Sequence, residues 1–302
     1  FRTVSSVSGI DSASVTNYTF LDGGLNQVFI TNAVKLPKGF SLGLTTSFVL
    51  GTINRKIEEV AQNYNNGFLE NPFTKTVINA KEVYRFVDFK LGLGYHKLIS
   101  TKYAIGMGAT GTFNQNITTK RELISSINSN NLTSDYDGYA IYSDTVSEDK
   151  QSAKLPSVYT FGFNFEKLNR WNVAVDYAFT DYSQYKSFAP INVFTSGHKV
   201  TIGTEFIPNY DAIRGYLKRV VYRAGGYYNQ TPLNIRGTQI NDMGATLGLG
   251  LPVGKGGIGM MNLAVAVGRR GTTANNVVEE NYIRFFIGLN VNDRWFVRYK
   301  IE

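Results

Sequence analysis

The chain has 302 residues, of which 43% are hydrophobic and 14% aromatic, and its 31 basic and 23 acidic residues give a formal net charge of +8. It has no cysteine and only two histidines, which excludes disulfide bonds and the cysteine- and histidine-rich classes of metal site. No apolar run approaches the roughly 20 residues of a membrane helix, and the basic residues are spread along the sequence without a dense Lys/Arg run, so we expect no nucleic-acid partner.

The dominant local pattern is an alternation of apolar and polar positions, which predicts β-strands because successive side chains of a strand point to opposite faces. In residues 282–291, Ile283, Phe285 and Ile287 share one face, whereas Arg284 and Phe286 share the other. Counting back from this segment gives roughly twelve strands. In chain order they include residues 1–10, 40–51, 86–96, 103–114, 158–166, 171–180, 198–206, 220–228, 242–251, 262–270 and 282–291.

Strand length and aromatic placement separate a membrane barrel from a soluble barrel or sandwich, which would also alternate. The predicted strands are about 9–13 residues long, against a usual 5–6 in soluble sheets, and this matches a tilted membrane strand. Aromatic residues lie towards the ends of the apolar faces, as in the interfacial girdles of outer-membrane barrels. They are Phe40, Tyr95, Tyr103, Phe113, Trp171, Phe179 and Phe206. We therefore predict that residues 1–302 form one all-β domain, a transmembrane antiparallel β-barrel.

The connections alternate in length, which orients the barrel because outer-membrane barrels have short periplasmic turns and long extracellular loops. Residues 36–39, 96–101 and 167–170 are short, whereas we expect long extracellular loops over residues 53–83 and 116–154, with a short amphipathic helix over residues 56–63. Further connections lie outside (181–196, 229–240, 271–281) or inside (208–218, 252–260). Residues 292–302 also alternate, but a further strand would end outside, so we interpret them as a periplasmic tail.

The second face of these strands carries small and polar residues with scattered charges, and we expect it to line the lumen. A lipid-facing Arg or Lys at the bilayer midplane would cost roughly 2–4 kcal/mol. The inward charges form either a structural network or a ligand path, and the inward aromatics are candidate contacts for a ligand. The candidate lumen residues are Phe86, Asp88, Lys90, Lys199, Glu205, Arg223, Arg270, Arg284 and Phe286.

Enzyme chemistry is not indicated, and we expect no catalytic residue, metal or cofactor. His96 and His198 are interpreted as surface residues and suggest no Ser/His/Asp triad. The glycine-rich stretch at residues 248–257 superficially resembles a phosphate loop. Such a loop requires a following helix, and the alternation over residues 261–270 instead predicts a tight turn between strands.

The order of several short motifs resembles the FadL/TodX family of long-chain fatty acid and hydrocarbon transporters, in a divergent branch. These motifs are Leu155-Pro156-Ser157, Thr180-Asp181-Tyr182-Ser183, Tyr222-Arg223-Ala224-Gly225-Gly226-Tyr227-Tyr228 and Thr231-Pro232. The resemblance covers residue 20 onwards apart from the two long loops, and implies about fourteen strands, an N-terminal hatch and a lateral gap in the wall. The hatch and about two strands would precede Phe1. None of the family's ligand contacts carries over to named residues.

Two functions from different classes remain open, with a water-filled porin as a third. The leading hypothesis is passive uptake of a hydrophobic small molecule, such as a long-chain fatty acid, across a Gram-negative outer membrane, with membrane lipid and the ligand as partners. The alternative is a non-transport barrel subunit of an outer-membrane secretion or assembly complex, with the long loops as contacts for other outer-membrane proteins, because fold does not fix function.

Overall fold

The computed structural model describes residues 2–6, 14–65, 68–70, 74–129, 140–185, 194–253 and 259–291. Almost all of them lie in strands, and the helical segments are three-residue turns, η1 (Pro37–Gly39), η2 (Tyr216–Lys218) and η3 (Ala274–Asn276). None of the helices in these ranges is long and apolar enough to cross a membrane. The strands are β1 (Arg2–Ser6), β2 (Ser14–Lys35), β3 (Phe40–Asn65), β4 (Phe68–Glu70), β5 (Thr74–Leu98), β6 (Tyr103–Thr112), β7 (Asn116–Ser129), β8 (Ala140–Lys154), β9 (Ser157–Lys167), β10 (Trp171–Asp181), β11 (Gly197–Phe206), β12 (Val221–Ile235), β13 (Thr238–Val253), β14 (Gly259–Gly271) and β15 (Glu279–Val291).

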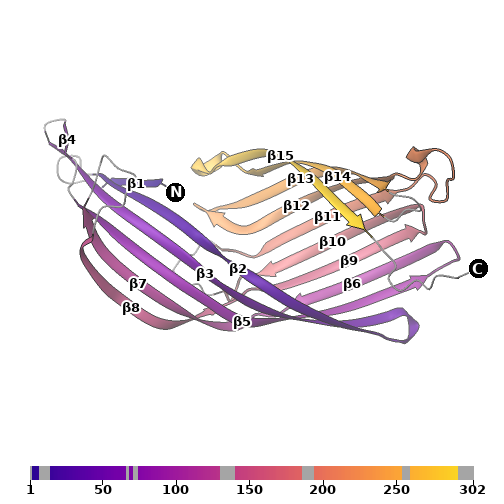
Figure 1. Cartoon of the computed structure of the whole chain (residues 1–302), viewed down its shortest axis with the longest axis horizontal. Helices are drawn as coiled ribbons and strands as arrows, with labels where there is room; N and C mark the ends of the chain where they lie inside the picture. Colours follow the sequence, from indigo (N-terminus) through magenta and orange to yellow (C-terminus); the bar gives the residue numbers. More distant parts are fainter. Residues whose placement is uncertain are drawn as a thin grey trace, which may run out of the picture.

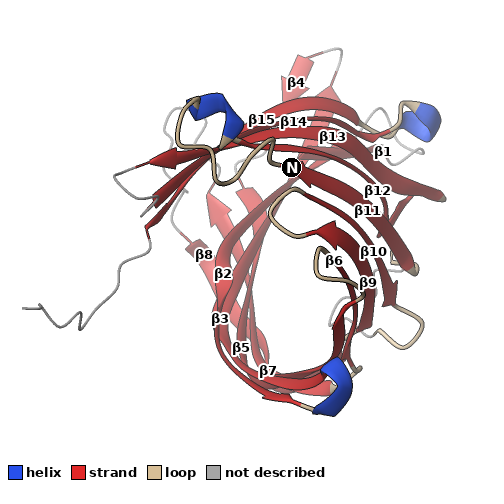
Figure 2. Ribbon diagram, turned by 90° about the vertical axis from the view of Figure 1, so that its right-hand side faces the viewer, coloured by secondary structure: helices blue, strands red, loops and turns tan. Residues whose placement is uncertain are grey.

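The strands form one antiparallel sheet that curls into an outer-membrane type of β-barrel wall. Its order is β1-β2-β3-β5-β6-β9-β10-β11-β12-β13-β14-β15, a path of twelve strands, with β4 paired to β3 and the β7–β8 hairpin paired to β5. Figure 2 shows the sheet bending round a central opening, with β2, β3, β5 and β7 on one side and β6, β9, β10 and β11 on the other. The all-β transmembrane barrel predicted from the sequence is confirmed.

The two faces of the wall differ in exposure and chemistry as the alternation predicts. Along β13, the even positions from Asp242 to Gly248 are partly covered, whereas the odd positions from Met243 to Leu249 are exposed. Strand register extends each face across neighbouring strands: Phe206, Tyr222, Leu249, Leu263 and Ile287 are paired in series. Large exposed apolar side chains therefore form a band on the outer face, the arrangement that lipid tails require.

One end of the barrel has the short connections that the sequence predicts. The turn between β2 and β3 has left-handed backbone at Lys38 (φ 62°) and Gly39 (φ 91°), and a Cβ at position 39 would collide with the carbonyl oxygen of His96. Asn169, with φ 57°, closes the β9–β10 turn. These tight turns hold the strands in register at the end assigned to the periplasm.

The two long loops predicted over residues 53–83 and 116–154 are instead mainly strand. Residues 53–65 continue β3, residues 74–83 begin β5, and residues 116–129 and 140–154 form the paired strands β7 and β8. The helix expected over residues 56–63 is wrong, because this segment pairs with β2 and β5 as strand. Above the membrane both faces of a strand meet water, so both become polar and the alternation that marks a membrane strand disappears.

The remaining predicted connections and the first predicted strand have different outcomes. Residues 229–240 form no loop: β12 and β13 meet in a tight turn at Arg236 (φ 51°) and Gly237 (φ 79°). Parts of the predicted connections 181–196 and 252–260 lie outside the described residues, as does the segment 292–302. Of the first predicted strand, the structure describes β1.

Candidate functional site

All nine candidate lumen residues lie on the same face of the sheet, as the strand register shows. The clearest series runs across β11 to β15, where Glu205, Arg223, Gly248, Ala264 and Phe286 are paired in turn. Phe86, Asp88 and Lys90 share that face on β5; Lys199, Arg270 and Arg284 share it on β11, β14 and β15. The structure joins only Glu205 to Arg223 directly, and it leaves Phe86 and Phe286 on strands far apart along the sheet path.

Arg223 is the centre of a polar cluster on the lumen face. Its Nε donates to Glu205 Oε2 at 2.8 Å and its Nη1 donates to Asn262 Oδ1 at 2.7 Å. Nη2 lies 3.9 Å from the sulfur of Met260. Asn262 and Met260 were missed from the sequence, although Asn262 starts the predicted strand 262–270 on the same parity as Arg270. The register of β12, β13 and β14 would have placed Asn262 near Arg223.

A second polar cluster lies on the same face nearer the outer end. Tyr282 donates its hydroxyl to Asp242 Oδ1 at 2.6 Å, and the Tyr227 hydroxyl contacts that of Tyr282. The guanidinium of Arg284 lies 4.1 Å from the centre of the Tyr282 ring. The sequence analysis identified Arg284 by its charge and overlooked the tyrosines and Asp242. These contacts tie β12, β13 and β15 together across the lumen face.

Between these clusters the lumen face has a small pocket of about 350 Å³. Its lining combines polar side chains with glycines and small or apolar residues of β10 to β13, and the polar ones include Asn172, Thr201, Glu205, Arg223 and Tyr227. Asn172 Oδ1 is buried and has no hydrogen-bond partner among the described residues. An alkyl chain that entered this pocket would displace water from the ion pair and the hydrogen-bonding groups without replacing their hydrogen bonds.

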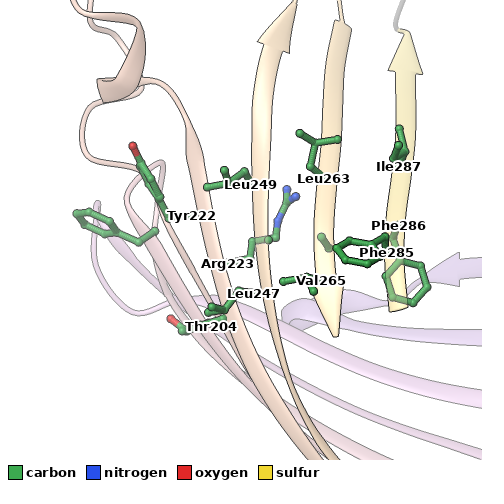
Figure 3. Close-up of a pocket in the computed structure, with 14 residues that line it drawn as sticks. Thr204, Tyr222, Arg223, Leu247, Leu249, Leu263, Val265, Phe285, Phe286 and Ile287 are labelled. Atoms are coloured by element: carbon green, nitrogen blue, oxygen red, sulfur yellow. The ribbon is translucent and has the colours of Figure 1, made fainter. Parts of the chain in front are cut away.

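The apolar pockets lie on the opposite, outer face. One, of about 750 Å³, spans β11 to β15. Figure 3 shows Leu249, Leu263 and Ile287 on adjacent strands of this pocket. A second, of about 950 Å³, spans β3, β5, β6 and β9. Side chains that line these pockets, such as Leu247 (63% exposed) and Phe285 (79% exposed), are accessible to lipid.

Aromatic side chains form a belt at each end of this apolar face, as predicted. At the periplasmic end the Phe165 ring lies 5.9 Å from Tyr103 and 5.2 Å from Trp171. At the other end Phe179 lies 5.0 Å from His198. Trp171 and Phe179 lie on one strand, eight residues apart, about 26 Å along it at the usual rise per residue. At the usual strand tilt of about 35–45° this length rises about 20 Å along the membrane normal, somewhat less than the roughly 25 Å height of the apolar band in outer-membrane barrels.

Strands β2, β3, β5, β7 and β8 continue past the outer belt as a five-stranded sheet, which we call the extension (Figure 1). The outer face of β3 changes from Phe48 and Leu50 to Asn54, Lys56 and Glu58. Glu58 is 8% exposed and pairs with Lys56 at 2.8 Å and with Lys75 at 3.2 Å. The Glu58–Lys75 ion pair joins β3 to β5 within the extension.

The extension also has a charged depression and an outermost strand. The depression, of about 490 Å³, lies across β2, β3, β5 and β7 and is lined in part by Asp22, Lys56, Lys81 and Glu122. Along the described part of the sheet, β8 pairs only with β7, so its other edge is open. An open strand edge is a template for pairing with another chain.

Nine of the 31 basic residues lie in turns at the periplasmic end, although they are spread along the sequence without a dense run. Residues 35–39, 97–102, 167–170 and 207–219 hold nine Lys or Arg and one carboxylate, Asp211. This excess equals the net charge of the whole chain, +8. The excess of positive charge is not evident in the sequence, because the turns that carry it are separate in the chain and come together at one rim only in the folded barrel.

The two histidines make side-chain contacts with residues of other strands. His96 lies 3.5 Å from Glu166, and the His198 ring nitrogen lies 2.8 Å from the Tyr177 hydroxyl. Among the described ranges, no group of three or more His, Asp or Glu is arranged to hold a metal ion.

Comparisons with known proteins give a family for the sequence and a fold for the structure. A family model described as BamG matches residues 3–302. No protein of curated function matches the chain in sequence. The CymD monoaromatic hydrocarbon channel superimposes with a TM-score of 0.53 at 13% identity, covering 97% of this chain and 78% of CymD. A Pseudomonas aeruginosa FadL homologue has a TM-score of 0.49 at 12% identity, covering 95% of this chain and 74% of its own. The toluene transporter TodX of P. putida has a TM-score of 0.40 at 12% identity, covering 97% of this chain and 82% of TodX.

At 13% identity the likeness to CymD shows a shared fold alone. The FadL/TodX resemblance noted in the sequence therefore holds for the barrel architecture, whereas the family match is to BamG.

Proposed function

Because the chain belongs to the BamG family, we propose that it serves as a β-barrel subunit of an outer-membrane protein assembly complex in a Gram-negative bacterium. The family match spans the barrel wall and the extension together. In this role the barrel anchors the chain in lipid, and the surfaces outside the membrane contact partner proteins.

The observation that carries this proposal is the extension. Strand β3 has 26 residues and β5 has 25, against 11 in β10. Ordering so many additional residues costs conformational entropy, which a membrane-spanning wall alone does not require. The outer face of the extension presents charges of both signs, and β8 offers an open edge, so the extension supplies both charge complementarity and strand pairing to a partner.

The lumen face supports the same proposal. A channel for hydrocarbons needs an apolar route, whereas the described lumen surface between β10 and β13 carries the Glu205–Arg223 ion pair, Asn172 and Tyr227. Passing an alkyl chain there would desolvate these groups without compensation.

Uptake of a hydrophobic small molecule is the second candidate. It is favoured by the barrel fold shared with a hydrocarbon channel and by the 750 Å³ apolar pocket of Figure 3. In that case a fatty acid or aromatic hydrocarbon would occupy the apolar surface at β11 to β15.

Purification of the full chain from its own outer membrane in mild detergent tests the proposal. We expect large outer-membrane proteins to copurify in fixed ratio, and the isolated chain to bind no fatty acid. A chain that purifies alone and binds fatty acid would overturn the assembly role and support uptake.

A hairpin variant locates the contact. Asn116 lies directly opposite Lys154, so replacing residues 117–153 by Asn-Gly closes the strand pair at its base. We expect this variant to fold in the membrane and to lose its partners. As a control, residues 235–238 at the tip of the β12–β13 hairpin are replaced by Asn-Gly, which should leave the partners bound. Equal partner recovery from both variants would contradict a role for the β7–β8 hairpin.

A further inference from the structure

An apolar groove of about 950 Å³ on the outer face reaches the periplasmic end of the barrel. Its floor is at Ala109 of β6, which lies in register between Leu93 of β5 and Phe161 of β9. Leu93 is 51% exposed and Phe161 54% exposed, so the walls are apolar and accessible from the bilayer. The width between these side chains exists because alanine occupies the central position.

The periplasmic end of the groove is aromatic and basic. Phe40 and Tyr95 lie opposite each other in register, with ring centroids 4.8 Å apart. Lys38, in the β2–β3 turn, and Lys97, near the end of β5, also line the groove. Neither ammonium group forms a salt bridge with a carboxylate among the residues that the structure describes. The groove therefore ends at two cations that form no ion pair within the described part of the chain.

We propose that this groove binds an anionic phospholipid of the periplasmic leaflet, with its acyl chains along Leu93, Ala109 and Phe161 and its phosphate between Lys38 and Lys97. The inference rests on the membrane placement in the proposed function. Apolar walls select the chains, and the two ammonium groups select a negative headgroup over a zwitterionic one. Basic residues beside a membrane surface each contribute roughly a five-fold preference for anionic lipid.

Charge complementarity and position favour a lipid over an acidic protein as the occupant. The lysines terminate an apolar groove that faces the bilayer, so an amphiphile satisfies both parts at once. The excess of positive charge on the neighbouring turns extends the same preference around the rim. An acidic protein would use the lysines and leave the groove to bulk lipid.

Native mass spectrometry tests the site on the full chain released from nanodiscs that contain equal amounts of phosphatidylglycerol and phosphatidylcholine. We expect the wild type to retain phosphatidylglycerol preferentially. Lys38→Gln/Lys97→Gln should lower that retention roughly five- to twenty-five-fold and leave phosphatidylcholine unchanged. Ala109→Trp, which fills the floor without changing charge, should also lower it. Heat-dependent gel mobility checks that each variant is folded.

The matched control is Lys81→Gln/Lys120→Gln, which removes the same charge from exposed positions of the extension. It should retain phosphatidylglycerol as the wild type does. Unchanged retention by the Lys38/Lys97 variant, or an equal loss in the control, would overturn the site. Loss of a protein partner from the Lys38/Lys97 variant, with its lipid retention intact, would overturn the site in favour of an acidic protein. A chain that never enters the bilayer contradicts the proposed function, whereas an inserted chain without lipid preference contradicts only this inference.

Discussion

Two adjacent residues of β11 offer a sharp test of which face meets lipid. Ile202 is 53% exposed and lies four residues from Phe206 and four from His198, about 13 Å along the strand from each belt. It therefore lies near the bilayer midplane, where a lysine costs roughly 2–4 kcal/mol. Thr201 points to the lumen, opposite Asp176 and Tyr227 in register, and a lysine there gains a carboxylate neighbour.

Ile202→Lys should thus lower the free energy of unfolding by about 2–4 kcal/mol, roughly a 30- to 1,000-fold change in the folding equilibrium, whereas Thr201→Lys should change it by less than about 1 kcal/mol. The assay is a urea titration of folding into lipid vesicles, followed by heat-dependent gel mobility. The reasoning is refuted if Thr201→Lys is as damaging as Ile202→Lys, because both faces would then meet the same environment.

Three further predictions concern Arg223 in the lumen, Gly23 in β2 and Tyr84 in β5. Arg223→Met should lower the free energy of unfolding by about 1 kcal/mol. Its coupling to Glu205→Gln in a double-mutant cycle should stay below about 1 kcal/mol, because both side chains are about 40% exposed. A coupling of several kcal/mol would contradict a solvated lumen. Gly23→Ala should be destabilising, since φ is +114° and the added Cβ meets the backbone of β3, whereas Gly24→Ala has open space and should be neutral in the same urea titration; equal effects would sink the explanation. Burial and a hydrogen bond to a carboxylate raise the pKa of Tyr84, so its stabilising contribution is complete below about pH 10 and is lost as pH rises through the higher folded-state pKa; the absorbance difference from Tyr84→Phe at 295 nm should show no step near pH 10.

The membrane wall could be predicted from the sequence because lipid imposes a rule on every second residue. Residues 242–251, for instance, alternate between apolar and polar side chains and lie within β13, so the alternation alone predicts which side chains face lipid and which face the lumen. The same rule hides the extension. Lys56, Glu58 and Glu59 lie on both faces of β3, so the segment resembles a loop or a polar helix although it is paired on both sides.

The candidate site was predictable only in part, for a related reason. Alternation assigns Glu205 and Arg223 to the lumen, but their contact and that of Asn262 depend on register between hairpins. The groove is still harder to predict, because Lys38 lies in the β2–β3 turn and Lys97 near the end of β5, and only the β3–β5 pairing brings them to one groove.

The barrel itself is tested most directly by a spin-label scan along β13. The chain has no cysteine, so single cysteines can be placed at residues 242–249 without removing any. In lipid vesicles, labels at Met243, Ala245, Leu247 and Leu249 should collide often with oxygen, which concentrates in acyl chains, and the intervening labels should collide more often with a water-soluble nickel chelate. A profile without this two-residue period, or with the opposite phase, would contradict the assignment of the apolar face to lipid.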